Sequence, residues 1–114
     1  MKVAIIGSRN YPELVKVREF VRALPDNTIV ISGGAKGVDE TAEEEAKKLG
    51  LEVISITPEW DKWGKYAGLK RNDMIVSMAD EVVAFWDGVS RGTKYTIDKA
   101  REKNVITEVY NVVN

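Results

Sequence analysis

Residues 29–39 contain the feature that most constrains how this chain can fold. The apolar, β-branched run 29–31 is followed by Ser32 and by three glycines, Gly33, Gly34 and Gly37, and an amphipathic helical pattern begins straight after them. This order is typical of a buried strand, a tight turn and the start of a helix. Glycines let a ligand approach backbone N–H groups closely, and a helix N-terminus adds unpaired donors and a partial positive charge. The stretch therefore predicts an anion-binding turn, with a plain strand-to-helix connection as the alternative.

Short apolar runs alternate with helical patterns along the whole chain. Runs typical of buried strands cover residues 3–6, 28–32, 51–56, 81–85 and 105–109. Helical patterns cover residues 12–24, 38–49, 69–79 and 93–103, while 57–68 has no regular period and the last residues form a short tail. Strict alternation indicates a parallel sheet covered by helices on both faces. We therefore predict one α/β domain, residues 1–114, with a Rossmann-like sheet of five strands in the order 3-2-1-4-5.

The helical patterns also predict which side chains face the sheet. The apolar stripe of the second pattern consists of Val38, Ala42, Ala46 and Leu49. Glu43 and Glu44 each stand four residues before a lysine, a spacing that stabilises a helix. We expect the run Glu43-Glu44-Glu45 to be a solvated helix face without a function. In the later patterns the side chains expected to face the core are Ile75, Met78, Ile97 and Ala100.

The amino-acid composition excludes several classes of chemistry. The chain contains neither cysteine nor histidine, which rules out disulfides, cysteine-based zinc sites, a cysteine nucleophile and a serine–histidine triad. We expect no metal and no resident cofactor. The formal net charge of −1 gives no general attraction to nucleic acid, but it leaves a local basic patch open. The apolar run 3–6 is too short for a signal peptide or a membrane span, so we expect a cytoplasmic protein without a membrane partner.

Four polar turns follow the predicted strands at the edge where open parallel sheets bind ligands. They are Gly7-Ser8-Arg9, Ser32-Gly33-Gly34, the loop 60–68 and the stretch from Asp87 to Thr93. Strands one, two and four are neighbours in the predicted order, so their turns should meet in one crevice. Gly7 is not followed by the further glycines of a dinucleotide-binding fingerprint, and residues 34–37 lack the Gly-Lys-Ser/Thr ending of a Walker loop. The sequence therefore disfavours a nicotinamide-dependent oxidoreductase and a P-loop NTPase.

The basic and hydroxyl side chains of these turns each have two interpretations. Arg9 either grips a phosphate through two hydrogen bonds or is a solvated loop residue. Arg71 and Asn72, which we expect to open the third helix, either contact a ligand or provide surface charge and capping. Ser90 and Thr93 either cap the last helix or, together with Gly92, bind a phosphate.

The acidic and aromatic residues leave similar alternatives open. Asp39 either caps the second helix or accepts a hydrogen bond from a sugar hydroxyl. Asp87 either forms the turn with Gly88 or has a functional role. The aromatic residues of the loop 60–68 either stack on a base or cover the edge of the sheet; they are Trp60, Trp63 and Tyr66.

As an ordered set, these motifs resemble the SLOG superfamily, which includes the Smf/DprA proteins and the Lonely-guy enzymes. The motifs are Gly7-Ser8-Arg9, the stretch 32–39, Arg71-Asn72 after Ala67-Gly68, and the stretch 84–93. The resemblance covers almost the whole chain and looks strongest to the small YspA-type branch, whose function is unknown. It implies a Rossmannoid fold that binds a nucleotide or a nucleotide-derived ligand, and it implies a homodimer.

The resemblance further implies where a ligand phosphate lies. In the superfamily this position is near the glycine turn after the second strand, here with Gly33, Gly34 and Gly37, and near the Gly92-Thr93 turn. The ligand-binding residues that we predict are Gly7, Ser8, Arg9, Ser32, Gly33, Gly34, Ala35, Gly37, Asp39, Arg71, Asn72, Asp87, Ser90, Gly92 and Thr93. Thr96 stands where the Lonely-guy enzymes carry their catalytic glutamate, so we assign no catalytic residue.

Three functions are consistent with these observations. The leading one is a module that binds, and thereby senses, a nucleotide or a nucleotide-derived phosphorylated ligand. The second is a phosphoribohydrolase-like enzyme that hydrolyses the N-glycosidic bond of a nucleotide, with Asp39, Asp87 or Asp98 as the available carboxylates. The third is binding of single-stranded DNA, because residues 32–39 are similar to the turn that binds single-stranded DNA in DprA. Nucleic acid is the less favoured partner of the two classes of ligand.

Overall fold

The computed structural model describes residues 1–112, so the last two residues of the predicted tail lie outside the described part of the chain. The strands are β1 (Lys2–Gly7), β2 (Ile29–Ser32), β3 (Glu52–Ser55), β4 (Glu81–Trp86) and β5 (Ile106–Asn111). The helices are α1 (Leu14–Arg22), α2 (Val38–Lys48), α3 (Trp60–Trp63), the 3-10 turn η1 (Gly64–Tyr66), α4 (Ala67–Met78) and α5 (Arg91–Glu102). None of the helices in residues 1–112 is both long and apolar enough to cross a membrane.

The five strands form one parallel sheet in the order β3-β2-β1-β4-β5, which confirms the predicted topology. After β1 the chain moves outward through β2 to β3, and it then returns to the other side of β1 to form β4 and β5. The direction of winding therefore reverses between β1 and β4. There Gly7 pairs with Phe85 at the carboxyl ends of the two strands, and this is the place where such sheets leave room for a ligand.

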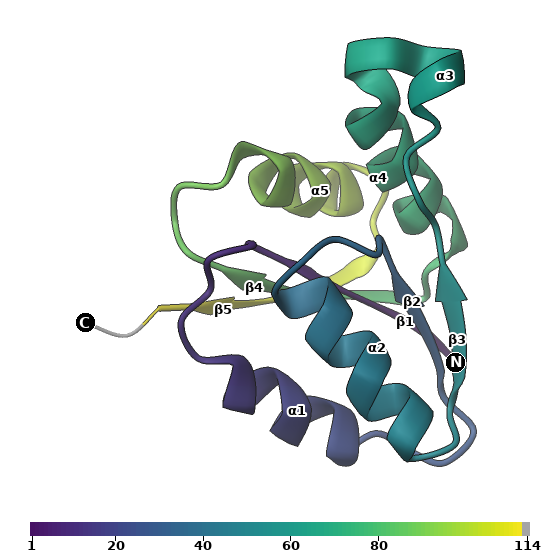
Figure 1. The fold of residues 1–114 in the computed structure, drawn as a ribbon, viewed down its shortest axis with the longest axis vertical. Coiled ribbons are helices and arrows are strands. Elements are labelled where there is room, and N and C mark those ends of the chain that lie inside the picture. Colours follow the sequence, from purple (N-terminus) through teal and green to yellow (C-terminus); the bar gives the residue numbers. More distant parts are fainter. Residues whose placement is uncertain (113–114) are drawn as a thin grey trace.

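Helices cover both faces of the sheet, as the alternating pattern predicts (Figure 1). On one face α1 and α2 bury a core that includes Val17, Val38 and Phe85. On the other face α4 and α5 pack over a second core that includes Ile75, Ile97 and Ala100, with Met78 at its margin. The central strands are buried on both faces, which explains why β1 and β4 read as continuous apolar runs.

The prediction of a loop over 60–68 is wrong. Residues 60–63 form the short helix α3, residues 64–66 form η1, and α4 begins at Ala67, two residues earlier than expected. A single turn is too short to show a helical period in the sequence. The aromatic side chains do not cover the sheet edge: Trp60 is 60% exposed, and α3 stands at the upper end of the molecule, beyond the sheet (Figure 1).

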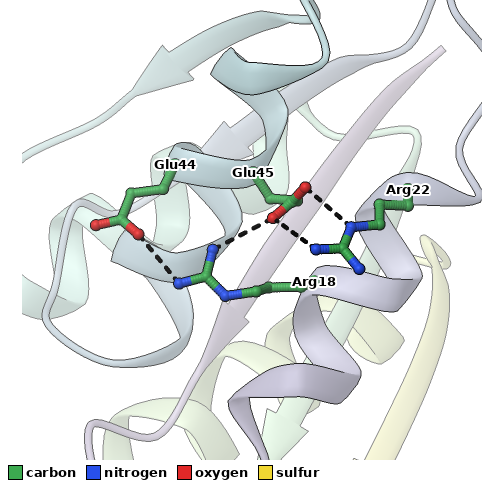
Figure 2. Close-up of polar contacts among 4 residues, drawn as sticks. All are labelled: Arg18, Arg22, Glu44 and Glu45. Atoms are coloured by element: carbon green, nitrogen blue, oxygen red, sulfur yellow. Dashed lines mark hydrogen bonds and ion pairs between the residues drawn. The ribbon is translucent and has the colours of Figure 1, made fainter.

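The expectation that 43–45 form a solvated helix face holds for Glu44, which is exposed, but it is wrong for Glu45. Glu45 is buried, and its carboxylate binds Arg22 at 3.0 Å and Arg18 at 3.2 Å, while Arg18 also reaches Glu44 at 3.2 Å (Figure 2). Glu43 accepts a hydrogen bond from Ser32 Oγ at 3.0 Å. The arginines of α1 thus bind Glu45 and also Glu44, for which the sequence pattern predicts a lysine partner in the same helix.

The predicted apolar stripe of α2 holds for three of its four members. Val38, Ala42 and Ala46 are fully buried against the sheet, but Leu49 is 47% exposed. Leu49 lies at the C-cap of α2, where the helix ends and the chain turns through Gly50 toward β3. The helical period therefore stops predicting burial at the last residue of the stripe.

Candidate functional site

A cleft of about 220 Å³ lies beyond the carboxyl ends of β1 and β4, where the sequence predicts a binding crevice. Most of the predicted ligand-binding residues line it: Gly7, Ser8, Arg9, Ala35, Asp39, Arg71, Asn72, Ser90, Gly92 and Thr93. The other predicted residues are absent from this lining; among the described residues they are Ser32, Gly33, Gly34, Gly37 and Asp87. The turns after β1, β2 and β4 do converge, together with the second turn of α4.

Asp39 lies in the first turn of α2 and is only 4% exposed. Its Oδ2 accepts a hydrogen bond from the backbone N–H of Gly33 at 3.0 Å, so the carboxylate bonds the glycine turn rather than capping its own helix. Burial raises the pKa of Asp39 from 3.8 to about 6, although Arg71 and the backbone N–H groups of Ala35, Gly33 and Gly7 favour the ionised form. Asp39 therefore already occupies donors that the sequence analysis assigns to a phosphate.

Arg71 and Asp39 both contact Gly33. Its Nη1 donates to the carbonyl oxygen of Gly33 at 2.6 Å, and its Nε donates to Asn72 Oδ1 at 2.8 Å. Burial lowers the pKa of Arg71, Asp39 opposes that shift, and the positive charge of Arg9 adds to it. Arg71 and Asn72 lie in the second turn of α4 rather than at its start, because α3 and η1 lead directly into a longer helix.

The turn after β4 is organised by Asp87. Asp87 Oδ1 accepts hydrogen bonds from the backbone N–H groups of Val89 and Ser90, at 2.9 and 2.8 Å, and from Ser90 Oγ at 2.9 Å. The Asp87 N–H in turn donates to Ser8 Oγ at 3.1 Å. The geometry favours the turn-forming interpretation of Asp87, and it joins the β4 turn to the β1 turn.

The N-terminus of α5 faces the cleft. Ser90 stands at its N-cap position, but the Ser90 hydroxyl is directed to Asp87 and to Ser8 Oγ, 2.6 Å away, rather than to the first helical turn. Gly92 and Thr93 of that first turn line the cleft, and Thr93 is buried. Since the first N–H groups of a helix have no partner inside the helix, this end of α5 offers donors to an anion.

Two glycines explain how the turns pack so closely. Gly37, just before α2, has a φ of +85°, and a Cβ there would stand 2.5 Å from the carbonyl oxygen of Arg9. A Cβ on Gly33 would meet Arg71 Nη1 at 2.7 Å and Asp39 Oδ2 at 2.8 Å. Gly37 therefore lets the turn before α2 approach the β1 turn, and Gly33 lets the side chains of Arg71 and Asp39 approach the β2 turn.

The sequence analysis missed two residues that line the cleft. Ile6 belongs to β1 and was interpreted only as core. Thr96 is buried one turn into α5, where its Oγ1 donates to the carbonyl oxygen of Gly92 at 3.0 Å. Its position four residues after Gly92 would have placed it on the same helix face.

The charges of the cleft define what it can bind. Among the described residues, the charged side chains of its lining are Arg9, Arg71 and Asp39. Two guanidinium groups, a hydroxyl and a helix N-terminus suit a phosphate. Of the three carboxylates considered for catalysis, only Asp39 reaches the cleft: Asp98 is exposed and pairs with Lys94 at 2.7 Å. Residues 1–112 contain no group of three or more acidic side chains placed to hold a metal ion.

A second cavity, of about 410 Å³, shares Arg71 with the cleft. It lies beside α3 and α4, and its lining includes Trp63, Lys62 and Lys70. The ammonium groups of Lys62 and Lys70 lie 5.1 and 4.8 Å from the centre of the Trp63 ring system. The lining also contains Glu59 and Asp73, so the three basic side chains exceed the acidic ones by a single charge, and the lysines gather around Trp63.

Comparison with known proteins identifies the family. Residues 1–59 match the family model of DNA recombination-mediator protein A. The Gene 61 protein of Mycobacterium phage D29 is 32% identical in an alignment that covers 91% of each of the two chains.

Two solved structures share the fold. The DNA processing protein A (DprA) of Streptococcus pneumoniae matches 99% of this chain with a TM-score of 0.81 and 21% identity. The DNA processing protein A of Helicobacter pylori, whose structure is described as showing a unique single-stranded DNA binding mode, matches 96% with a TM-score of 0.72 and 22% identity. This chain spans 50% and 64% of those two proteins. The family model matches just over half of the residues, and the chain therefore belongs to the family of DNA recombination-mediator protein A.

Proposed function

We propose that this protein binds single-stranded DNA, with one backbone phosphate in the cleft. The observation that carries the proposal is the convergence of Arg9, Arg71 and the N-terminus of α5 on one small space. Guanidinium groups and helix N-termini are the usual protein partners of phosphate. The family relationship and the H. pylori homologue's binding of single-stranded DNA support the same ligand.

The adjoining cavity supports a strand rather than an isolated phosphate. Its Trp63 side chain is 40% exposed, and Lys62 and Lys70 flank it. Single-stranded nucleic acids bind where cations follow the backbone and aromatic rings stack on bases. Arg71 belongs to both linings, so a phosphate in the cleft would place the next nucleotides beside Trp63.

Fluorescence anisotropy of a labelled oligothymidylate tests the proposal. We expect binding at low salt, and we expect Arg9→Ala to weaken it. Because one phosphate contact is lost, the slope of log affinity against log salt concentration should become shallower by about 0.7 in this variant. Arg101→Ala removes the same charge from the exposed far end of α5 and should leave the affinity unchanged. No binding at low salt, or equal losses in both variants, would contradict the proposal.

A free nucleotide is the second candidate ligand, and the small volume of the cleft favours it. Competition by thymidine monophosphate and the variant Trp63→Ala separate the two candidates. If the ligand is a strand, Trp63→Ala should lower the affinity for the oligonucleotide. If the ligand is a free nucleotide, thymidine monophosphate should compete as strongly as the unlabelled oligonucleotide does. Native mass spectrometry of the purified protein would reveal a retained nucleotide, and it also tests the homodimer that the superfamily resemblance implies.

A further inference from the structure

Asp39 is the single acidic side chain that the described residues contribute to the lining of the cleft. We propose that phosphate binding in the cleft is coupled to the uptake of one proton by Asp39, so that Asp39 sets the pH range in which the cleft accepts an anion. The inference rests on the proposed function, because it requires a phosphate in this cleft.

The geometry places two anions in one confined space. Asp39 and the donors available to a phosphate line the same volume of about 220 Å³. The Asp39 carboxylate is almost fully buried, so water screens it poorly from a bound phosphate. Repulsion between two nearby negative charges favours protonation of one of them. Protonation of Asp39 removes the repulsion and leaves the negative charge of the phosphate intact.

Asp39 is already close to protonation without a ligand. Burial raises its pKa to about 6, against the opposing effects of Arg71 and of the surrounding backbone N–H groups. A bound phosphate also draws on the charge of Arg71, which is the strongest of these opposing influences. The pKa of Asp39 in the complex should therefore rise further, toward and beyond neutrality.

The surroundings leave Asp39 as the group that takes the proton. The charged side chain that acts on Asp39 is Arg71 from α4, and Arg9 from the β1 turn, which also lines the cleft, acts on Arg71. The α5 side chains of the lining, Thr93 and Thr96, are uncharged. Glu43, one turn further along α2, points to Ser32 Oγ.

Protonation of Asp39 need not dismantle the cleft. Arg71 is held by its hydrogen bonds to the Gly33 carbonyl oxygen and to Asn72 Oδ1, neither of which depends on the Asp39 charge. A protonated carboxyl group can still accept a hydrogen bond from the Gly33 N–H through its carbonyl oxygen. Once Asp39 is protonated, its charge no longer compensates the positive charge of Arg71. The Arg71 side chain stays in place, and its full charge can attract the phosphate.

The test measures oligothymidylate affinity between about pH 5.5 and about pH 8, where the ligand itself does not titrate, at constant ionic strength. We expect the affinity of the unmodified protein to rise as the pH falls, by at most about tenfold per pH unit, the limit for one proton. Asp39→Asn should bind at high pH as the unmodified protein does at low pH, with little dependence on pH. Asp26→Asn, an exposed change outside the cleft, should keep the pH dependence of the unmodified protein.

A second measurement does not depend on any variant. Calorimetric titration of the unmodified protein in two buffers of different ionisation enthalpy counts the protons that accompany binding, and near neutral pH we expect uptake of a large fraction of one proton. Binding without proton uptake overturns the inference and leaves the proposed function intact. Absence of binding at every pH overturns the proposed function, and the inference falls with it.

Discussion

Arg71 Nη1 donates a hydrogen bond of 2.6 Å to the carbonyl oxygen of Gly33, and this contact ties the second turn of α4 to the turn after β2. The two residues come from opposite faces of the sheet, since α2 follows Gly33 on one face and α4 packs on the other. The guanidinium is thereby fixed above the carboxyl edge of the sheet, with its remaining donors available to the cleft.

Gly33→Ala should weaken DNA binding more than it weakens the fold. The new Cβ would stand 2.7 Å from Arg71 Nη1 and 2.8 Å from Asp39 Oδ2, so the ends of both side chains must shift and the guanidinium leaves its position in the cleft. Loss of one charge-assisted contact should reduce oligothymidylate affinity about tenfold. Gly68→Ala is the control: its Cβ meets open space in the first turn of α4, so we expect unchanged binding and a gain of about 0.5–1 kcal/mol in unfolding free energy. Equal binding by both variants would contradict the role of Arg71.

Asp39 should make the unliganded protein less stable as the pH rises. Its pKa of about 6 lies above the value of 3.8 for an unperturbed carboxyl group, so the folded state holds the proton more tightly than the unfolded state. Stability is therefore lost between about pH 4 and pH 6, by at most about 3 kcal/mol, and is constant above that range. Urea denaturation of Asp39→Asn should show its stability rising relative to the unmodified protein across this window. A constant difference would contradict the raised pKa.

Glu45→Gln should destabilise the protein more than Glu44→Gln. Glu45 is buried between Arg18 and Arg22, whereas Glu44 is half exposed and contacts Arg18 alone (Figure 2). Hydrogen bonds from Arg22 and Arg18 lower the pKa of Glu45 against the effect of burial. Its contribution to stability is thus complete above the ordinary glutamate pKa and is lost as the pH falls below it. Urea denaturation midpoints of both variants at neutral and acidic pH test whether Glu45→Gln is the more destabilising change. Equal shifts of the midpoint relative to the unmodified protein would contradict this prediction.

Tyr11→Phe should leave stability unchanged or raise it by up to about 1 kcal/mol. The Tyr11 hydroxyl is buried without a hydrogen-bond partner among residues 1–112, and its ring packs edge-on against Phe85 at 5.6 Å. Tyr95→Phe is the matched control, because the Tyr95 hydroxyl lies 2.7 Å from Asp73 Oδ1 and its loss should cost about 0.5–1.5 kcal/mol. Thermal denaturation of both variants compares them, and a larger loss from Tyr11→Phe would reveal a partner for its hydroxyl.

The sheet and the meeting of its turns were predictable because both depend on local patterns. Apolar runs such as 3–6 mark strands that are buried on both faces, and alternation with helices leaves few possible strand orders. The position of the cleft then follows from the reversal of strand order between β1 and β4. These inferences require no knowledge of individual side-chain contacts.

The wrong predictions concern contacts between elements. Glu45 reads as solvated within its own helix, and only the packing of α1 on α2 brings Arg18 and Arg22 to it. The donors of the Gly33 turn read as free for a phosphate, but the carboxylate of Asp39 turns back from α2 and accepts the Gly33 N–H. A spacing of six residues along the chain does not reveal that this carboxylate points toward the turn.

The most direct test of the central proposal is an NMR titration of the ¹⁵N-labelled protein with an unlabelled oligothymidylate. Binding of a backbone phosphate in the cleft predicts the largest shifts at the amides of Gly92 and Thr93 and at the guanidinium Nε–H groups of Arg9 and Arg71, followed by the indole N–H of Trp63. Amides at the far end of α5, near Arg101, should not move. Shifts that are absent from the cleft, or that concentrate on another surface, would contradict the proposal that this cleft holds the phosphate of a DNA strand.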